Sequence, residues 1–390
     1  MAKRLPLLAA AAAVAATPAA ATEVEVSGSA QAEIANYRDT GASGDNGLAF
    51  TDAMRGELGV DVVEDLGQQV AVLARYRLRL NTTRAAWSEE QREAFVGLEA
   101  PFGRITAGSL KPAYKYTGGV TYDPFAWTTL EARSNAGMLG YERPLFVSTP
   151  SFGQHGYMSD ALGYEVTGEN IAFHINASLD QGNYRTRDEE DATSDRGEEG
   201  DYSAALKFFG RDWEGFLAVS MNDWDAVAVK EDEDNPGAAE FVHLLDDDGG
   251  YETIGRSFQA AKIGGQYEGE AHTFSLQFEG FEGEEEAADV VDAENIDVGL
   301  GDQTGWSGFA GYQFDFEPNT YVFQLGGQRI SNDADHIDDV NGIYAATGFI
   351  HSFSEESRLF LGYRFNRFTS DTDEFDFKQR TWSLGLRKDF

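Results

Sequence analysis

Apolar and polar residues alternate along most of this 390-residue chain. Side chains two positions apart lie on the same face of a strand, so the alternation predicts β-strands with one apolar face. Segment 171–180 is typical, because Ile171 and Phe173 alternate with His174 and Asn176. The same pattern recurs, about ten residues at a time, in segments 70–80, 272–279 and 357–366. The chain is therefore predicted to be all-β.

Short turns and long loops alternate between the predicted strands. The short turns lie at 64–68, 101–103, 167–170, 210–213, 268–271, 315–319 and 353–356. The long loops lie near 37–54, 81–92, 110–157, 185–200, 223–255, 283–303, 332–341 and 369–376. Soluble sandwiches also alternate, but this asymmetry of connections is typical of a transmembrane antiparallel β-barrel. We expect about 16 strands, with both chain ends on the short-turn side.

The chain ends in TWSLGLRKDF, which places Trp382 and Leu384 on one face of a strand. Chain ends are usually polar and frayed, so an apolar strand that runs to Phe390 indicates a paired terminus. We expect strand 377–390 to pair with strand 24–36, because a sheet edge cannot stay open in lipid. Phe390 would then lie at the inner membrane interface, where aromatic residues collect.

Residues 1–21 have the features of a cleaved secretory signal peptide. Lys3 and Arg4 precede an apolar run, and Ala19 and Ala21 form an A-x-A cleavage site. The apolar run is short and rich in alanine, which disfavours the alternative of an uncleaved anchor helix. We expect one barrel domain over residues 22–390.

Composition agrees with a β-rich chain and excludes several classes of site. The 43 Gly, 27 Phe and 16 Tyr suit strands and tight turns. The absence of cysteine excludes disulfides, zinc–thiolate sites and thiol nucleophiles. The net charge of −37 argues against nucleic acid as a partner.

The negative charge gathers in the long loops. Acidic runs lie at 187–191, 230–237, 246–248, 282–286 and 332–339. Such runs are typical of a solvated surface. Weak binding of divalent cations is the alternative, since hard cations take oxygen ligands, but no EF-hand spacing is present. We expect no cofactor and no defined metal site.

The connection 110–157 is the longest and is rich in Tyr, Phe and Trp. Long connections without their own structure are usually functional or disordered, and this one has enough apolar residues to pack. We expect it to fold into the barrel lumen as a constriction loop. A lid or a subunit-contact loop outside the barrel is the alternative.

Arginine recurs at every second position of one predicted strand. Arg75, Arg77 and Arg79 alternate with Tyr76 and Leu78. Arginine on the lipid face of a barrel costs about 2–4 kcal/mol at the midplane, so the three arginines are expected to face the lumen.

These arginines and Arg55 form the predicted basic wall. Glu57 and Asp61 share the inward face of the neighbouring strand with Arg55. Charge rings select ions in pores, so the wall is expected to face loop residues across a narrow gap. The loop candidates are Asp123, Glu131 and Arg133. Two alternatives remain: Arg133 pairs with Glu131, or the lumen charges only solvate the wall.

Two stretches resemble Gram-negative general diffusion porins. Residues 94–119 resemble the strand, turn, strand and loop entry of that family, through Gly97, Leu98, Phe102, Gly103 and Gly108. Residues 156–178 look like the strand after its constriction loop, and Phe390 matches its terminal aromatic residue, which acts in assembly.

The resemblance implies a homotrimer of 16-stranded barrels that passes small hydrophilic solutes and ions. It also implies an outer-membrane location in a Gram-negative bacterium, in contact with lipid and lipopolysaccharide. The loop has fewer carboxylates than the best-known enteric members of the family.

Three function classes compete. A passive diffusion channel needs a wide lumen and a loop folded into it. A substrate-specific sugar or anion channel is the alternative, and aromatic loop residues support it: Tyr114, Tyr116, Tyr122, Phe125 and Trp127. An enzyme is not expected, because none of the six histidines lies in a recognisable catalytic or metal-ligand motif.

Overall fold

The computed structural model describes most of the chain beyond its first residues. The described residues are 22–40, 46–53, 55–83, 86–133, 135–138, 157–178, 201–227, 229–231, 239–241, 244–245, 251–285, 302–332, 339–370 and 376–390. The predicted signal peptide, 1–21, lies outside these ranges.

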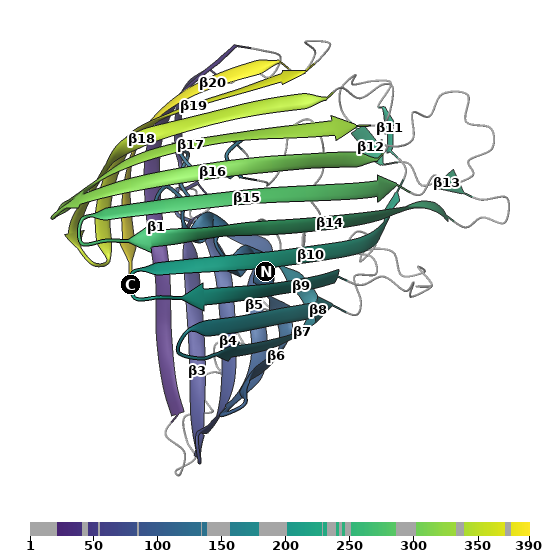
Figure 1. The fold of residues 1–390 in the computed structure, drawn as a ribbon, viewed down its shortest axis with the longest axis vertical. Coiled ribbons are helices and arrows are strands. Elements are labelled where there is room, and N and C mark those ends of the chain that lie inside the picture. The colour runs from purple at the N-terminus through teal and green to yellow at the C-terminus, as the bar shows by residue number, and fades with distance from the viewer. Residues whose placement is uncertain are drawn as a thin grey trace.

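Sixteen strands form one closed antiparallel barrel (Figure 1). They are β1 (Thr22–Thr40), β3 (Glu57–Gly67), β4 (Val70–Asn81), β5 (Ala86–Ala100), β6 (Gly103–Leu110), β7 (Met158–Thr167), β8 (Ile171–Ser178), β9 (Asp201–Phe209), β10 (Trp213–Val227), β14 (Tyr251–Glu268), β15 (His272–Glu285), β16 (Gln303–Phe316), β17 (Asn319–Asn332), β18 (Val340–Ser354), β19 (Ser357–Ser370) and β20 (Phe377–Asp389). Each pairs with its neighbour in the chain, and β10 pairs with β14.

Shorter elements lie between the barrel strands. They are β2 (Gly47–Thr51), β11 (Val229–Glu231), β12 (Ala239–Phe241), β13 (Leu244–Leu245), the one-turn helix α2 (Ala113–Tyr116) and the 3₁₀ turn η2 (Gly119–Thr121). Among the described residues, no helix is long and apolar enough to cross a membrane.

The last strand closes the barrel against the first, as the sequence predicts. Ile34 of β1 lies opposite Leu384 of β20. The other edge of β1 pairs with β3, where Val26 lies opposite Val60. The chain end is fixed by two backbone hydrogen bonds, from Phe390 N to Gly28 O at 3.0 Å and from Gly28 N to Phe390 O at 2.7 Å. Closure leaves no strand edge open to lipid.

The seven predicted short turns are confirmed, because a strand ends and the next begins at each of them. The predicted loop 81–92 is wrong in length, since β4 ends at Asn81 and β5 begins at Ala86. The predicted loop 37–54 contains β2, which pairs with β1 on the same edge as β3. Together β2 and β3 form one interrupted partner of β1.

The two faces of the strands from β14 to β20 differ in exposure. On β15, the Leu276 side chain is 66% exposed, whereas its neighbour Gln277 is 1% exposed. Apolar side chains point outward around the barrel, while polar side chains gather on the buried inner face. This is the reverse of a soluble protein and is typical of a transmembrane barrel.

Candidate functional site

The segment that follows β6 is almost wholly buried. We call residues 111–133 and 135–138 the loop segment. Its fully buried side chains include Tyr114, Phe125 and Leu130. They pack in one cluster with wall residues of distant strands, among them Phe216 and Phe309. A surface loop would leave such aromatic side chains in water, so this packing holds the segment against the barrel wall.

The first part of the loop segment hydrogen bonds to β8, β9 and β15. Ala113 N donates to Asn176 Oδ1 at 2.7 Å, and Tyr114 N donates to Ser203 Oγ at 2.8 Å. The Tyr114 hydroxyl donates to Glu279 Oε2 at 2.9 Å. All three wall residues lie on the buried face of their strands.

Gly118 allows the next turn of the segment. Its φ is +59°, a left-handed conformation that L side chains rarely adopt. A Cβ here would also overlap the ring of Phe216. The turn brings Gly119 N to Gln277 Oε1 at 2.5 Å. The segment therefore follows the wall closely at this point.

The second part of the loop segment hydrogen bonds to β1, β18 and β19. The Tyr344 hydroxyl donates to Leu130 O, and Arg364 Nη1 donates to Thr129 O, both at 2.7 Å. Glu33 Oε2 accepts from Thr129 N at 3.0 Å and from Thr129 Oγ1 at 2.9 Å. One buried carboxylate therefore fixes the tip of the segment.

Asp123 lies elsewhere than the sequence predicts. Its carboxylate accepts from Phe125 N and Ala132 N, both at 2.8 Å, and from Gln324 Nε2 of β17 at 2.6 Å. Burial raises the pKa of Asp123 to about 6. The expected opposition between Asp123 and the arginines is therefore corrected. The carboxylate closes a turn of the segment and ties it to β17, because three donors occupy its oxygens.

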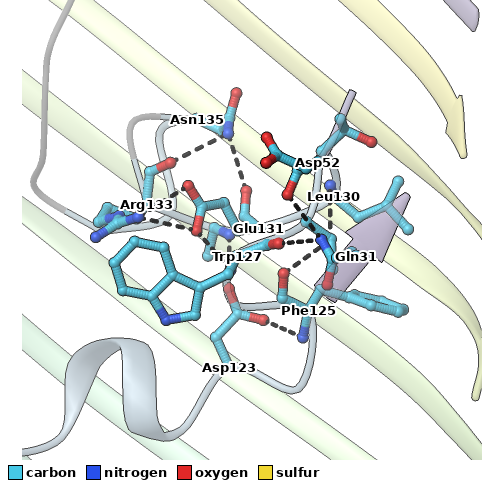
Figure 2. Close-up of polar contacts among 12 residues, drawn as sticks. Gln31, Asp52, Asp123, Phe125, Trp127, Leu130, Glu131, Arg133 and Asn135 are labelled. Carbon is cyan, nitrogen blue, oxygen red and sulfur yellow. Dashed lines mark hydrogen bonds and ion pairs between the residues drawn. The ribbon is translucent and has the colours of Figure 1, made fainter. Parts of the chain in front are cut away.

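Glu131 and Arg133 contact each other. Arg133 Nη2 lies 3.2 Å from both carboxylate oxygens of Glu131, which also accepts from Trp127 N at 3.0 Å. Figure 2 shows this group, together with the hydrogen bond from Gln31 to Trp127. The alternative that Arg133 pairs with Glu131 is the arrangement observed. The ion pair with Arg133 thus weakens the electrostatic interaction of Glu131 with the basic wall.

Three cations surround the ring of Trp127. Arg133 Cζ lies 4.4 Å from the ring centroid, Arg92 Cζ 5.3 Å and Lys115 Nζ 5.9 Å. Burial lowers the pKa of Lys115 well below its ordinary value, and the charge of Arg133 lowers it further. Cations over an aromatic face are attracted by its quadrupole. The loop segment and β5 thus place three basic side chains around one ring, and two of them, Arg92 and Arg133, also pair with Glu57 and Glu131.

Sequence reasoning missed Arg92 and Lys115. The pairing of β4 with β5 shifts between Tyr76 and Leu78, which lie opposite Ala94 and Gln91. The extra residue on β5 is a bulge, which re-aims side chains. Arg92 is therefore buried, at 5% exposure, although strict alternation places it on the outward face with Ala94.

The predicted basic wall is built from β3 and β4. Arg75 Nε lies 2.5 Å from Asp61 Oδ1, and Arg77 pairs with the other oxygen of the same carboxylate. Arg92 Nη1 lies 2.5 Å from Glu57 Oε2. Gly59 lies opposite Arg77 and leaves space for its guanidinium, because a Cβ at Gly59 would overlap it.

The remaining wall arginines complete a net positive group. Arg79 lies opposite Glu57 in the register of β3 and β4. Arg55 precedes β3, and its Nη2 lies 3.6 Å from Asp389 Oδ1 of β20. Arg75 also lies 3.6 Å from Glu93. Arg55, Arg75, Arg77, Arg79 and Arg92 thus outnumber the carboxylates of Glu57, Asp61, Glu93 and Asp389.

Acidic groups offer no metal site in the part of the chain that the structure describes, where no three His, Asp or Glu side chains are arranged around a common point. The acidic runs at 187–191 and 246–248, and most of the runs at 230–237 and 332–339, lie outside that part.

Comparison with known proteins gives one family. A sequence-family model described as Gram-negative porin matches residues 8–371. No curated protein matches in sequence.

Solved structures with the same fold include three outer-membrane proteins. The anion-selective porin from Comamonas acidovorans is 15% identical with a TM-score of 0.66, covering 95% of this chain and all of that one. OmpT of Vibrio cholerae is 10% identical with a TM-score of 0.64, covering 95% and 98%. The channel DcaP of Acinetobacter baumannii is 11% identical with a TM-score of 0.61, covering 95% and 97%. At these identities the likeness shows the fold alone.

Proposed function

Because this chain belongs to the Gram-negative porin family, we propose that it lets ions and small hydrophilic solutes diffuse passively across the outer membrane. Family and fold indicate an outer-membrane diffusion channel rather than an enzyme. A 16-stranded barrel leaves an aqueous channel, which needs a constriction to discriminate solutes. Export through the cleaved leader at 1–21 is part of this proposal.

The observation that carries the proposal is the anchoring of the loop segment. Its hydrogen bonds reach buried inner-face residues from Glu33 of β1 through Glu279 of β15 to Arg364 of β19. A segment fastened to both sides of the wall suits a constriction that stays in place while solutes pass. We place the segment in the lumen, where it narrows the channel beside the basic wall.

The wall charges favour anions over cations. Arg75 is the most exposed of the ion-paired wall arginines, with 34% of its side chain accessible. An excess of fixed positive charge in a narrow aqueous gap lowers the free energy of a passing anion. The channel therefore selects anions weakly, although the protein as a whole carries a net charge of −37.

An anion-specific channel is the second candidate. The convergence of the basic side chains of Arg92, Lys115 and Arg133 on Trp127 favours it, although Arg92 pairs with Glu57 and Arg133 pairs with Glu131. The similar protein from Comamonas acidovorans is described as anion-selective. Block by one anion at low concentration distinguishes this candidate from passive diffusion.

A homotrimer is the assembly we propose. Aromatic side chains occur around most of the outer face, as lipid-facing barrels require at the membrane interfaces. The outer face of β3 to β6 instead carries mostly aliphatic side chains, such as Val60, Ala74, Val96 and Ala107, although Tyr76 of β4 and Phe102 in the turn after β5 are exposed. A sector poor in aromatic residues suits contact with another copy. One solved OmpT structure is described as a trimer form.

This contact sector is testable because the chain has no cysteine. A Val96→Cys variant should form cross-linked dimers with a short bis-maleimide in the membrane, because one thiol per protomer can join only two copies. Leu361→Cys, on the outer face of β19, is the matched control and should remain uncross-linked. Equal cross-linking of both variants would remove β3 to β6 as the contact sector.

The first experiment is single-channel recording of the refolded protein in a planar bilayer under a salt gradient. Steps in groups of three, with a reversal potential that indicates weak anion preference, are expected. Absence of any channel conductance would contradict the proposal of a diffusion channel. Conductance blocked by one sugar or anion at low concentration contradicts passive diffusion and selects a specific channel.

A further inference from the structure

A second group of arginines lies on the inner face of the barrel, beside the short-turn ends of β19 and β20. We call it the short-turn arginine group, and its members are Arg55, Arg358, Arg387 and Asp389. Arg358 of β19 lies directly opposite Arg387 of β20. Asp389 N donates to Glu356 O, in the short turn before β19, at 2.8 Å. The group therefore lies at the short-turn mouth, the end of the lumen beside the short turns.

Two contacts show that these arginines share the inner face. Arg364, six residues after Arg358 on β19, donates to Thr129 O of the loop segment. Ser383, four residues before Arg387 on β20, donates to the buried Glu33 of β1. Side chains an even number of positions apart lie on one face of a strand. Six residues span about 20 Å along a strand, so Arg358 lies well away from the anchored loop segment.

Positive charge exceeds negative charge in this group. Asp389 Oδ1 accepts from Arg387 Nε at 2.9 Å and lies 3.6 Å from Arg55 Nη2, so two guanidinium groups share one carboxylate oxygen. Phe390 adds a second carboxylate beside them, and its oxygen accepts from Gly28 N at 2.7 Å. Three arginines against two carboxylates leave an excess of positive charge.

Arg358 has no counter-charge of its own. Across the ranges that the structure describes, its guanidinium forms no ion pair and no hydrogen bond, whereas Arg387 is paired with Asp389. The side chain is half-buried, so solutes in the lumen can reach it. Like charges directly opposite each other on neighbouring strands destabilise a sheet. An anion between Arg358 and Arg387 offsets this repulsion.

The chemistry of guanidinium groups indicates which anion fits. Each presents its N–H donors in a planar fork that matches two oxygens of a carboxylate or of a tetrahedral oxyanion. A halide offers no such pair of oxygens. Two opposed arginines therefore favour oxyanions over chloride, a distinction that an excess of positive charge alone does not make.

We propose that Arg358 and Arg387 form a second anion site in the lumen, which binds carboxylates and other oxyanions at the short-turn mouth. The inference rests on the proposed function, because the site acts on solutes that pass through the channel. Arg55 belongs both to the basic wall and to this group. An oxyanion that leaves the wall thus meets further arginines before it leaves the lumen.

The first test locates the anion. Crystals of the unaltered protein are soaked in selenate, a sulfate analogue that scatters anomalously, and should show anomalous density between Arg358 and Arg387. Arg358→Gln removes the unpaired guanidinium without breaking an ion pair, so its crystals should lack this density. Arg367→Gln is the matched control, because Arg367 lies on the outer face of the same strand and is exposed. Its crystals should keep the density.

The second test measures what the site does to permeating anions. Single-channel chloride current is recorded while millimolar sulfate is added to one chamber at a time. Sulfate should reduce the current more strongly from one chamber than from the other, because the site lies near one mouth. Arg358→Gln should weaken the stronger block at least fivefold. Arg358→Lys, which keeps the charge without the fork, should also weaken it, while the reversal potential in potassium chloride stays unchanged.

Three results would overturn the inference. One is selenate density at the basic wall only. Another is equal sulfate block in Arg358→Gln and in the unaltered protein, with heat-modifiable gel mobility showing that both are folded. The third is an equal loss of block in Arg367→Gln, which would show that overall charge attracts sulfate. Failure of the proposed function gives a different result, because selenate density at Arg358 without any chloride current supports the site and contradicts transport.

Discussion

Replacing Arg75, Arg77 and Arg79 with glutamine should reverse the ion preference of the channel. The wall group has five arginines and four carboxylates, and the change leaves Arg55 and Arg92 against Glu57, Asp61, Glu93 and Asp389. The net charge of the wall thus changes from positive to negative. Asp61, which holds both Arg75 and Arg77, becomes a free carboxylate in the gap.

The magnitude follows from Coulomb's law. The Coulomb interaction energy between a permeating ion and a unit charge about 7 Å away in water is about 0.6 kcal/mol. Screening at 0.1 M salt, where the Debye length is about 10 Å, roughly halves this value. Removing three wall charges then changes the free energy of each ion in the channel by about 0.9 kcal/mol, with opposite signs for cations and anions. The permeability ratio should change by about twentyfold toward cations.

The assay is the reversal potential of single channels across a salt gradient near 0.1 M. The single variant Arg75→Gln should change the ratio by about threefold. Arg211→Gln is its matched control, because the Arg211 side chain lies in a short turn and is 94% exposed. In 1 M salt the Debye length falls to about 3 Å, and the effect of the triple variant should fall to about twofold.

An unchanged reversal potential in the triple variant at 0.1 M salt would refute the reasoning. It would mean that ions pass away from the wall group or that the wall charges only solvate the barrel. A change of equal size in Arg211→Gln would also contradict it, since the effect would then come from the overall charge of the protein.

Three further predictions concern the loop segment and the chain end. Glu33→Ala removes charge-assisted hydrogen bonds to Thr129, each worth about 1.5–3 kcal/mol, so current noise should rise while ion selectivity stays unchanged. Burial raises the pKa of Asp123 to about 6, so the folded state holds the proton more tightly than the unfolded state. The free energy of unfolding should therefore fall by about 2 kcal/mol as pH rises from 4 to 6, and urea titrations should show no such fall in Asp123→Asn. Phe390→Ala removes a ring that lies against Gly28; barrel formation, followed by heat-modifiable gel mobility, should slow without a change in selectivity.

Strand number and closure were determined by the sequence, because their signals are local. Alternation with a period of two and clusters of turn residues can be read in any ten-residue window. The turns at 101–103 and 167–170 therefore appear where expected. The pairing of β20 with β1 followed from a general physical demand, since lipid cannot satisfy an open edge. The inward phase of Arg75 and Arg77 stays a prediction, which rests on the cost of charge in lipid.

The tertiary structure decided what each charge contacts. Asp123 looks like a pore carboxylate in sequence, yet Gln324, 201 residues away, accounts for one of its hydrogen bonds. Glu33, which no motif marks, accepts hydrogen bonds from Thr129 and from Ser383, 350 residues away.

The position of Arg92 also could not be predicted from the sequence, although it depends on a single strand. A bulge between β4 and β5 moves it to the inner wall, and a shift of one residue reverses the face of a side chain without any change in composition. Period and turn chemistry depend on neighbours in the chain, so the sequence alone determined the barrel. The partners of charged side chains depend on which strands closure brings together, so only the folded barrel decided them.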